Sequence, residues 1–164
     1  MSAGAATLAI MQPLPHIYSV TGRAAAAGQV ILSTPGAPAL ASAAPAQFGG
    51  PGDQWSPESL LAAAFSSCFI LSFRSVARAS KLEWSRMECA VEATLGRIEG
   101  VMQFTRVVAR VTLTVPESAA TSLYERALAK AEHGCLVGNS LRCQRELQIE
   151  FVSEPAVQLQ AQAV

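Results

Sequence analysis

The sequence lacks an excess of charge of either sign. Its 164 residues include 12 Lys and Arg against 12 Asp and Glu, and only 15% of all residues are charged. Proteins that bind nucleic acid or an anionic membrane surface concentrate basic residues on one face or segment. We therefore expect neither nucleic acid nor a membrane among its partners.

Patterns typical of metal sites are also missing. The four cysteines contain no CxxC pair, and the only two histidines, His16 and His133, are far apart in the chain. Structural zinc sites usually show closely spaced pairs of such ligands. We expect no bound metal and no redox cofactor.

Export and membrane insertion are disfavoured too. The apolar patch within residues 1–15 lacks the preceding basic residues of a secretory signal. The longest strongly apolar stretch, residues 60–73, contains three serines and is shorter than the roughly 18 residues that mark a membrane span. We expect a cytoplasmic protein with one domain at residues 16–153, between flexible ends at 1–15 and 154–164.

Hydrophobic periodicity predicts a hairpin, a helix, a second hairpin, a second helix and a final strand. This order indicates an α+β fold with largely antiparallel sheets. A segment rich in proline and glycine, residues 34–54, is predicted to be a long surface loop. The predicted elements are strands at 16–22, 28–33, 87–95, 107–115 and 141–152, a helix from Ser56 to about Ser80, and a helix at 116–133.

The first predicted helix has a clear start and an unusual surface. Ser56 can cap it, Pro57 suits the first helical position, and Glu58 favours the helix dipole. Apolar residues occupy most of its faces as far as Phe73, so we expect protein to cover most of its sides. One small sheet cannot cover so much, which suggests that a second subunit contributes.

The four cysteines fall into two groups. Cys89 and Cys143 lie on the apolar faces of predicted strands, where a thiol behaves as a small hydrophobic group. Cys68 lies in mid-helix beside two serines, and from the residues alone core packing explains it as well as reactivity does. Cys135 follows the predicted helix end at Gly134, where a thiol can be exposed.

One alternative uses the second of these cysteines as a nucleophile. His133 lies two residues before Cys135 and is a candidate base for a cysteine-dependent hydrolase. A histidine at a helix end is more often simply a favourable cation there. In a hydrolase of this kind, an ester would label Cys135, and loss of Cys68 would have no effect.

Two cysteine motifs resemble those of a known family. The segment SPESLLAAAFSSCF, Ser56 to Phe69, resembles the helix motif of the OsmC/Ohr hydroperoxide reductases, in which an acid precedes the cysteine by ten positions. The segment KAEHGCLVGNSL, Lys130 to Leu141, is similar to the second cysteine motif of that family. The early YSVTGR and GGPG segments are similar to the Ohr branch, and the whole resemblance covers about residues 16–152.

The resemblance implies a fold and an activity. The fold is OsmC-like, with antiparallel sheets and two main helices in an intertwined homodimer. The implied activity is reduction of alkyl or lipid hydroperoxides, with Cys68 as the peroxidatic and Cys135 as the resolving cysteine. Arg23 and Glu58 would activate the thiol, and an external dithiol, possibly of the lipoyl type, would reduce the resulting disulfide.

Two departures from the family pattern concern this site. Leu136 and Gly138 stand where the family commonly has the proline and serine of a CPxS motif. The turn after Arg23 lacks the usual polar residues. The activating arginine therefore has the alternatives Arg74, Arg78 and Arg142. A protein of the same fold that only responds to redox state or binds a ligand stays open as a second interpretation.

Peroxide reduction explains why such residues belong together. A buried thiol has a raised pKa, and lowering it by ~2.5 units needs about 3.4 kcal/mol, which one charge ~4 Å away can supply at an effective dielectric near 20. Glu58 and Cys68 are ~15 Å apart on one straight helix, so Glu58 would act on the other subunit. Candidates for an apolar entrance are Phe48, Trp55, Leu61, Phe65 and Phe69.

Overall fold

The computed structural model describes residues 13–155. They form two compact units that divide between Gln54 and Trp55, and each unit is described by itself. The predicted flexible ends lie outside the described residues, apart from 13–15 and 154–155. The single domain predicted at 16–153 spans both units and stays a prediction.

The first unit is a small antiparallel sheet with the strand order β1-β2-β3. β1 (Thr21–Ala24) pairs with β2 (Val30–Ser33), so the predicted early hairpin is confirmed, although its first strand starts later than residue 16. β3 (Leu40–Ser42) lies in the segment that was predicted to be a loop. Three residues are too few for alternation to stand out among prolines and alanines, so only pairing with β2 defines this strand.

The second unit begins with the long helix α1 (Pro57–Ala79), where the sequence places it. The Ser59 N–H donates to the Ser56 hydroxyl at 3.2 Å, and the Ser56 N–H donates to the Ser59 hydroxyl at 2.8 Å. These two bonds satisfy backbone donors that have no partner within the helix. The helix start is therefore fixed by local side-chain chemistry.

Three strands form the sheet of the second unit, in the order β4-β5-β6. β4 (Arg86–Ile98) and β5 (Val101–Pro116) form a long antiparallel hairpin that extends beyond the predicted strands. The turn predicted at 96–100 shrinks to Glu99 and Gly100, both with positive φ. The hairpin is longer because cross-strand pairing continues through residues whose alternation is weak.

The last strand, β6 (Gln144–Glu154), runs parallel to β5. A parallel neighbour needs a crossover connection, which α2 (Thr121–His133) and the short α3 (Leu136–Asn139) supply. The antiparallel prediction thus holds for the other strand pairs, and the overall α+β class is confirmed. The sequence analysis missed α3, and α2 begins at Thr121 rather than at the predicted Pro116, which still belongs to β5.

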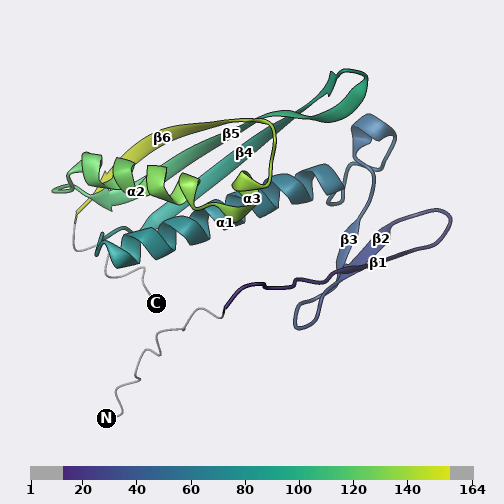
Figure 1. The fold of residues 1–164 in the computed structure, drawn as a ribbon, viewed down its shortest axis with the longest axis horizontal. Helices are drawn as coiled ribbons and strands as arrows, with labels where there is room; N and C mark the ends of the chain where they lie inside the picture. The colour runs from purple at the N-terminus through teal and green to yellow at the C-terminus, as the bar shows by residue number, and fades with distance from the viewer. Residues whose placement is uncertain (1–12, 156–164) are drawn as a thin grey trace, which may run out of the picture. The chain divides into compact units, whose positions relative to one another are not determined.

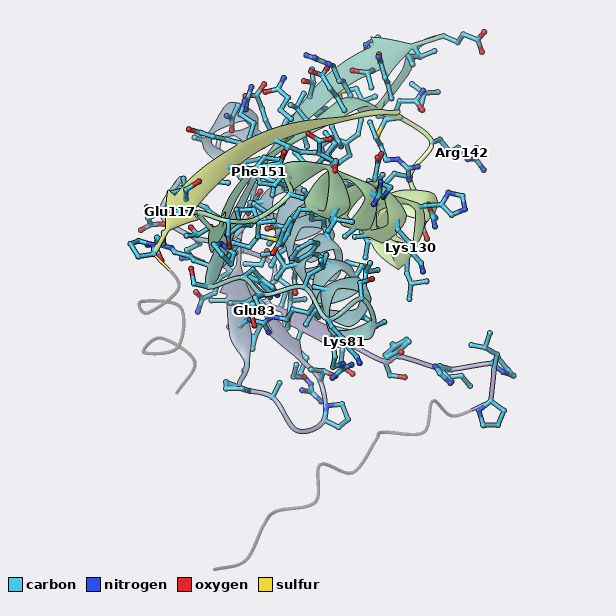
Figure 2. All side chains as sticks on the ribbon, turned by 90° about the vertical axis from the view of Figure 1, so that its left-hand side faces the viewer. Lys81, Glu83, Glu117, Lys130, Arg142 and Phe151 are labelled. Carbon is cyan, nitrogen blue, oxygen red and sulfur yellow. The ribbon has the colours of Figure 1, made fainter. Side chains whose placement is uncertain are left out.

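Both long helices lie on one face of this sheet (Figure 1). Phe151 of β6 packs edge-on against Tyr124 of α2, with ring centroids 6.4 Å apart, and Figure 2 labels Phe151 between strand and helix. The Tyr124 hydroxyl donates to the Glu83 carbonyl at 2.7 Å, on the connection between α1 and β4. The core thus lies between the sheet and the helices.

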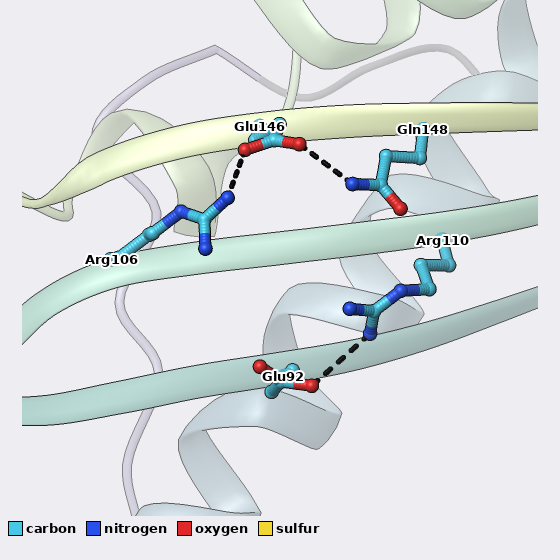
Figure 3. Close-up of polar contacts among 5 residues, drawn as sticks. All are labelled: Glu92, Arg106, Arg110, Glu146 and Gln148. Carbon is cyan, nitrogen blue, oxygen red and sulfur yellow. Dashed lines mark hydrogen bonds and ion pairs between the residues drawn. The ribbon is translucent and has the colours of Figure 1, made fainter.

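The opposite face of the sheet is polar (Figure 3). Arg106 forms an ion pair with Glu146, and Arg110 forms one with Glu92 at 3.2 Å. The hydrogen bond from Gln148 and the positive charge of Arg106 lower the pKa of Glu146. Each of these arginines therefore has a carboxylate partner on an exposed surface.

Only one stripe of α1 is buried: Phe65, Phe69, Phe73 and Ala77. Leu71 on another face is 57% exposed, so one chain does not cover most of the helix, and cover by a second subunit stays a prediction. Among residues 13–155, α1 is the one helix that is long and apolar enough to cross a membrane. Its phenylalanine stripe packs into the core of the unit, as in a core helix.

Candidate functional site

The second unit brings Cys68 and Cys135 together. Cys68 follows Phe65 by three residues, so both side chains point from the same side of α1. Phe65 lies against Gly138 of α3, and Cys135 immediately precedes that helix. The two thiols are close enough for a hydrogen bond and a charge interaction, and both are unbridged.

Cys135 is fully buried, whereas the sequence suggested an exposed thiol. The reason is α3, which folds back over the cysteine. The Cys135 sulfur accepts a hydrogen bond from the Gly138 N–H at 3.4 Å, and its own N–H donates to the Glu132 carbonyl at 3.1 Å. The cysteine thereby caps the short helix.

Burial, together with the neighbouring Cys68 thiol, raises the pKa of the Cys135 thiol from 9.0 to about 11. The Gly138 N–H and the positive charge of Arg145 act in the opposite direction. In the reduced protein Cys135 is therefore a neutral thiol at neutral pH. Its pKa must be lowered by its surroundings before Cys135 can act as a nucleophile.

Arg145 is a member of this site that the sequence analysis missed. It is the second residue of β6, and its Nη1 donates to the Asn139 Oδ1 at 3.4 Å. Strand alternation places Arg145 on the same face as Leu147, which packs against the core. An arginine that interrupts an apolar face was the available signal.

The predicted activating pair is not assembled around Cys68 within the second unit. Glu58 and Cys68 are separated by ten residues of α1, about 15 Å. One Glu58 carboxylate oxygen is buried and has no hydrogen-bond partner among the described residues. Arg23 lies on the exposed β1 of the first unit, and the alternatives Arg74, Arg78 and Arg142 are exposed, the last labelled in Figure 2.

The predicted apolar entrance divides by burial. Phe48 and Trp55 are about half exposed, at 50% and 47%, and Leu61 is half-buried. Phe65 and Phe69 are buried in the core. Phe65 lies near Cys135 through its contact with Gly138, but the role of all five in substrate binding stays a prediction.

The other two cysteines lie in structural surroundings. Cys89 is buried on β4, as predicted, and the Ser66 hydroxyl donates to its backbone carbonyl at 2.8 Å. Burial raises the pKa of the Cys89 thiol, while the Ser66 hydroxyl acts in the opposite direction. Cys143 packs against the core one residue before β6 begins, rather than within the predicted strand. Ser66, unexplained in the sequence, therefore joins α1 to the sheet.

The arrangement gives little support to a hydrolase. His133 is exposed, and its backbone carbonyl accepts a hydrogen bond from the Asn139 side chain at 2.8 Å. The titratable groups that shift the pKa of Cys135 are Cys68 and Arg145, and the imidazole is not among them. Within residues 13–155, no three His, Cys, Asp or Glu side chains gather as metal ligands.

Comparisons with known proteins agree with the fold. Residues 50–150 match the family described as OsmC-like protein. The chain belongs to this family. An uncharacterized protein of Bacillus subtilis, YmaD, is 24% identical over 109 residues, which are 65% of this chain and 73% of that protein.

Solved OsmC-like structures match most of the chain. An OsmC-like protein of unknown function from Vibrio cholerae has a TM-score of 0.76 and 19% identity, covering 83% of this chain and all of that one. An organic hydroperoxide resistance protein, OsmC, from Legionella pneumophila has a TM-score of 0.67 and 24% identity, covering 87% and 100%. The resemblance inferred from the two cysteine motifs is thereby confirmed.

Two residues of this OsmC-like chain depart from the family motif beside Cys135. Leu136 is 73% exposed, so it does not contribute to the buried site. Gly138 is buried, and a Cβ there would meet Phe65 Cε2 at 3.1 Å and Arg145 Nη1 at 3.2 Å. The glycine therefore leaves space that both neighbouring side chains use.

Proposed function

We propose that this OsmC-like protein is a cysteine-based peroxidase that reduces alkyl or lipid hydroperoxides to alcohols. The contact between the half-buried Cys68 and the buried Cys135 carries the proposal, since a peroxidatic and a resolving thiol must meet. The Legionella relative, named an organic hydroperoxide resistance protein, supports the same class of substrate.

The proposed reaction has two half-reactions on the protein. The Cys68 thiolate attacks one peroxide oxygen, so an S–O bond forms, the O–O bond breaks, and the alkoxide takes a proton to become the alcohol. The Cys135 thiolate then attacks the Cys68 sulfenic acid, forming the disulfide and releasing water. An external dithiol, such as a lipoyl group, returns both cysteines to the reduced state, and no bound cofactor is needed.

Cys68 is the better first nucleophile because it is less buried than Cys135. Its thiolate and the departing alkoxide both require a nearby cation. Arg23 supplies this cation in the proposed site, and the Glu58 carboxylate holds it. The buried Glu58 oxygen without a hydrogen-bond partner supports this role, since a guanidinium fork would satisfy it.

A homodimer completes the proposed site. α1 leaves apolar residues such as Leu71 exposed, which a second subunit would cover. The ~15 Å between Glu58 and Cys68 on one helix is bridged if Glu58 acts on the partner subunit's Cys68. We place this dimer in the cytoplasm, where a thiol reductant keeps the cysteines reduced.

Peroxide consumption by the reduced protein tests the function. With dihydrolipoamide as the dithiol, we expect faster turnover of cumene hydroperoxide than of hydrogen peroxide. Cys68→Ser should reduce turnover by roughly 100-fold or more, because the nucleophile is lost. Cys143→Ser is the matched control, since Cys143 is also half-buried but lies outside the thiol pair.

Either of two results would reject the peroxidase. Wild-type protein that consumes neither peroxide would leave the redox-responsive or ligand-binding interpretation of the fold. Activity that survives in Cys68→Ser but disappears in Cys135→Ser would move the chemistry to Cys135.

A further inference from the structure

We propose that Arg145 is a positioning residue for the resolving half-reaction: its guanidinium stabilises the Cys135 thiolate, and the missing side chain at Gly138 gives it access. This inference rests on the proposed peroxidase function. It adds a second cation to the site, separate from the one that activates Cys68.

Gly138 has both Arg145 and Cys135 as close neighbours. A Cβ built on Gly138 would stand 3.2 Å from the Arg145 Nη1 and 3.4 Å from the Cys135 sulfur. The guanidinium and the sulfur therefore border the same point, together with the edge of the Phe65 ring at 3.1 Å. The Gly138 N–H also donates to this sulfur at 3.4 Å, so a backbone dipole and a cation converge on it.

The partners of the arginines in the sheet support the same conclusion. Arg106 and Arg110, on the outer face, each form an ion pair with a glutamate (Figure 3). Arg145 lies half-buried on the inner face and has no carboxylate partner among the described residues. Its guanidinium donates instead to the neutral side-chain amide of Asn139.

An unneutralised arginine on an apolar face is costly to bury. It becomes favourable when a negative charge forms beside it. Within the described residues, the titratable or charged groups that act on the Cys135 sulfur are Cys68 from α1 and Arg145 from β6. Burial and Cys68 disfavour the thiolate, so Arg145 is the one cation that opposes them.

Both steps that involve Cys135 gain from this arrangement. In resolution, the Cys135 thiolate attacks the Cys68 sulfur, the S–S bond forms, the S–O bond breaks, and the hydroxide takes a proton to leave as water. In recycling, a dithiol thiolate attacks Cys68 and Cys135 leaves as a thiolate, and a leaving thiol of lower pKa departs faster. Arg145 transfers no proton in either step.

The first experiment titrates Cys135 directly. Thiolate absorbance at 240 nm is followed against pH in a Cys68→Ser background, with and without Arg145→Gln. Subtracting one titration curve from the other isolates the effect of Arg145. We expect the midpoint of the Cys135 titration to lie about one pH unit higher in Arg145→Gln, because the positive charge of Arg145 is removed. Arg145→Lys should restore part of the shift, and Arg106→Gln, which removes an arginine from the outer face, should leave the titration unchanged.

The second experiment separates the two half-reactions by stopped flow with cumene hydroperoxide. For each unit by which the Cys135 pKa rises, disulfide formation at neutral pH should slow about threefold. The fraction of Cys135 thiolate falls about tenfold, but each thiolate of higher pKa is a stronger nucleophile, which partly offsets the loss. Sulfenic acid formation, measured in a Cys135→Ser background, should stay within about twofold of its original rate in Arg145→Gln. Gly138→Ala should reproduce the slow resolution with Arg145 still present.

The outcomes distinguish this inference from the proposed function. Wild-type protein that consumes no peroxide rejects the peroxidase, and the resolving role with it. Wild-type turnover with an unchanged titration and an unchanged rate of disulfide formation in Arg145→Gln rejects the role of Arg145 alone. Circular dichroism melts confirm folding, and the conservative Arg145→Lys keeps the test available if Arg145→Gln is unstable.

Discussion

Cys89 and Cys135 are both buried, yet their surroundings differ. Burial raises the pKa of each thiol. The group that opposes burial at Cys89 is the neutral Ser66 hydroxyl, whereas Cys135 faces a second thiol, a backbone N–H and a cation. Burial disfavours the thiolate at both positions, so the groups around the two cysteines distinguish them, rather than burial itself.

The same helix serves both cysteines. Ser66 and Cys68 are two residues apart on α1, so their side chains diverge by about 200° around the helix axis. Ser66 reaches the Cys89 carbonyl on β4, and Cys68 reaches Cys135 beside α3. α1 therefore anchors the sheet with one face and presents the Cys68 thiol on another.

The largest expected difference lies in disulfide formation. After one equivalent of cumene hydroperoxide, wild-type protein should contain a Cys68–Cys135 disulfide, detected by mass spectrometry of digested protein. Cys135→Ser should contain none and should accumulate sulfenic acid on Cys68, because the resolving thiol is absent. Cys89→Ala should form the disulfide normally and should lose only about 1 kcal/mol of unfolding free energy through the small cavity.

The comparison would break if Cys89 formed the disulfide. A Cys68–Cys89 bridge, or a normal oxidised product in Cys135→Ser, would show that contact in the folded protein does not select the resolving cysteine. Cys143→Ser serves as the control for nonspecific thiol loss.

Alkaline pH should produce a smaller effect, on stability. The Cys135 pKa of about 11 in the folded protein lies above the ordinary 9.0. The folded state therefore holds the proton more tightly, so this contribution is complete below pH 9 and is lost as the pH rises through 11. Urea unfolding with reductant at pH 8 and pH 10 should show a smaller loss of unfolding free energy in Cys135→Ala than in wild type.

Some alkaline loss will persist in that variant. Burial also raises the pKa values of Cys89 and Tyr124. Equal losses in wild type and Cys135→Ala would contradict the raised pKa of Cys135. The pH 8 measurement corrects for the cavity that the substitution creates.

The smallest expected effect concerns the anchor at Cys89. Ser66→Ala removes the hydrogen bond to the Cys89 carbonyl, which should cost about 1 kcal/mol of unfolding free energy. Peroxide turnover should stay within about twofold, since Ser66 points to the strand rather than to Cys135. Chemical denaturation and the cumene hydroperoxide assay measure both quantities, and a large loss of turnover at normal stability would show that the two faces of α1 are not independent.

Much of the fold follows from local sequence. Capping by Ser56, Pro57 at the first turn and the phenylalanine spacing define α1, and strict alternation defines the centre of β5. β3 and α3 escaped prediction because segments of three and four residues carry too little periodicity. The parallel direction of β6 could not be predicted, because alternation of apolar and polar residues does not show which way a strand runs relative to its neighbour.

Part of the candidate site could likewise be predicted from local sequence, and part could not. Two motifs were enough to single out Cys68 and Cys135, because each combines a cysteine with a helix boundary or helix spacing. They did not reveal that Cys135 is buried, because its burial comes from α3 folding over it and from Phe65 of α1. Arg145 is ten residues beyond Cys135 in the chain and is brought near it only by the return of β6.

The amino-acid sequence alone was enough to predict the start of α1, the centres of the long strands, the family and the two candidate cysteines. These depend on hydrogen bonds and side-chain spacing within one element, where chain neighbours are also neighbours in space. Tertiary structure alone decided which thiols meet, which cysteine loses its contact with water, and which arginine faces sulfur rather than a carboxylate. Those properties depend on the distances between separate helices and strands and on how these elements exclude water from one another. The order of residues along one element does not specify either.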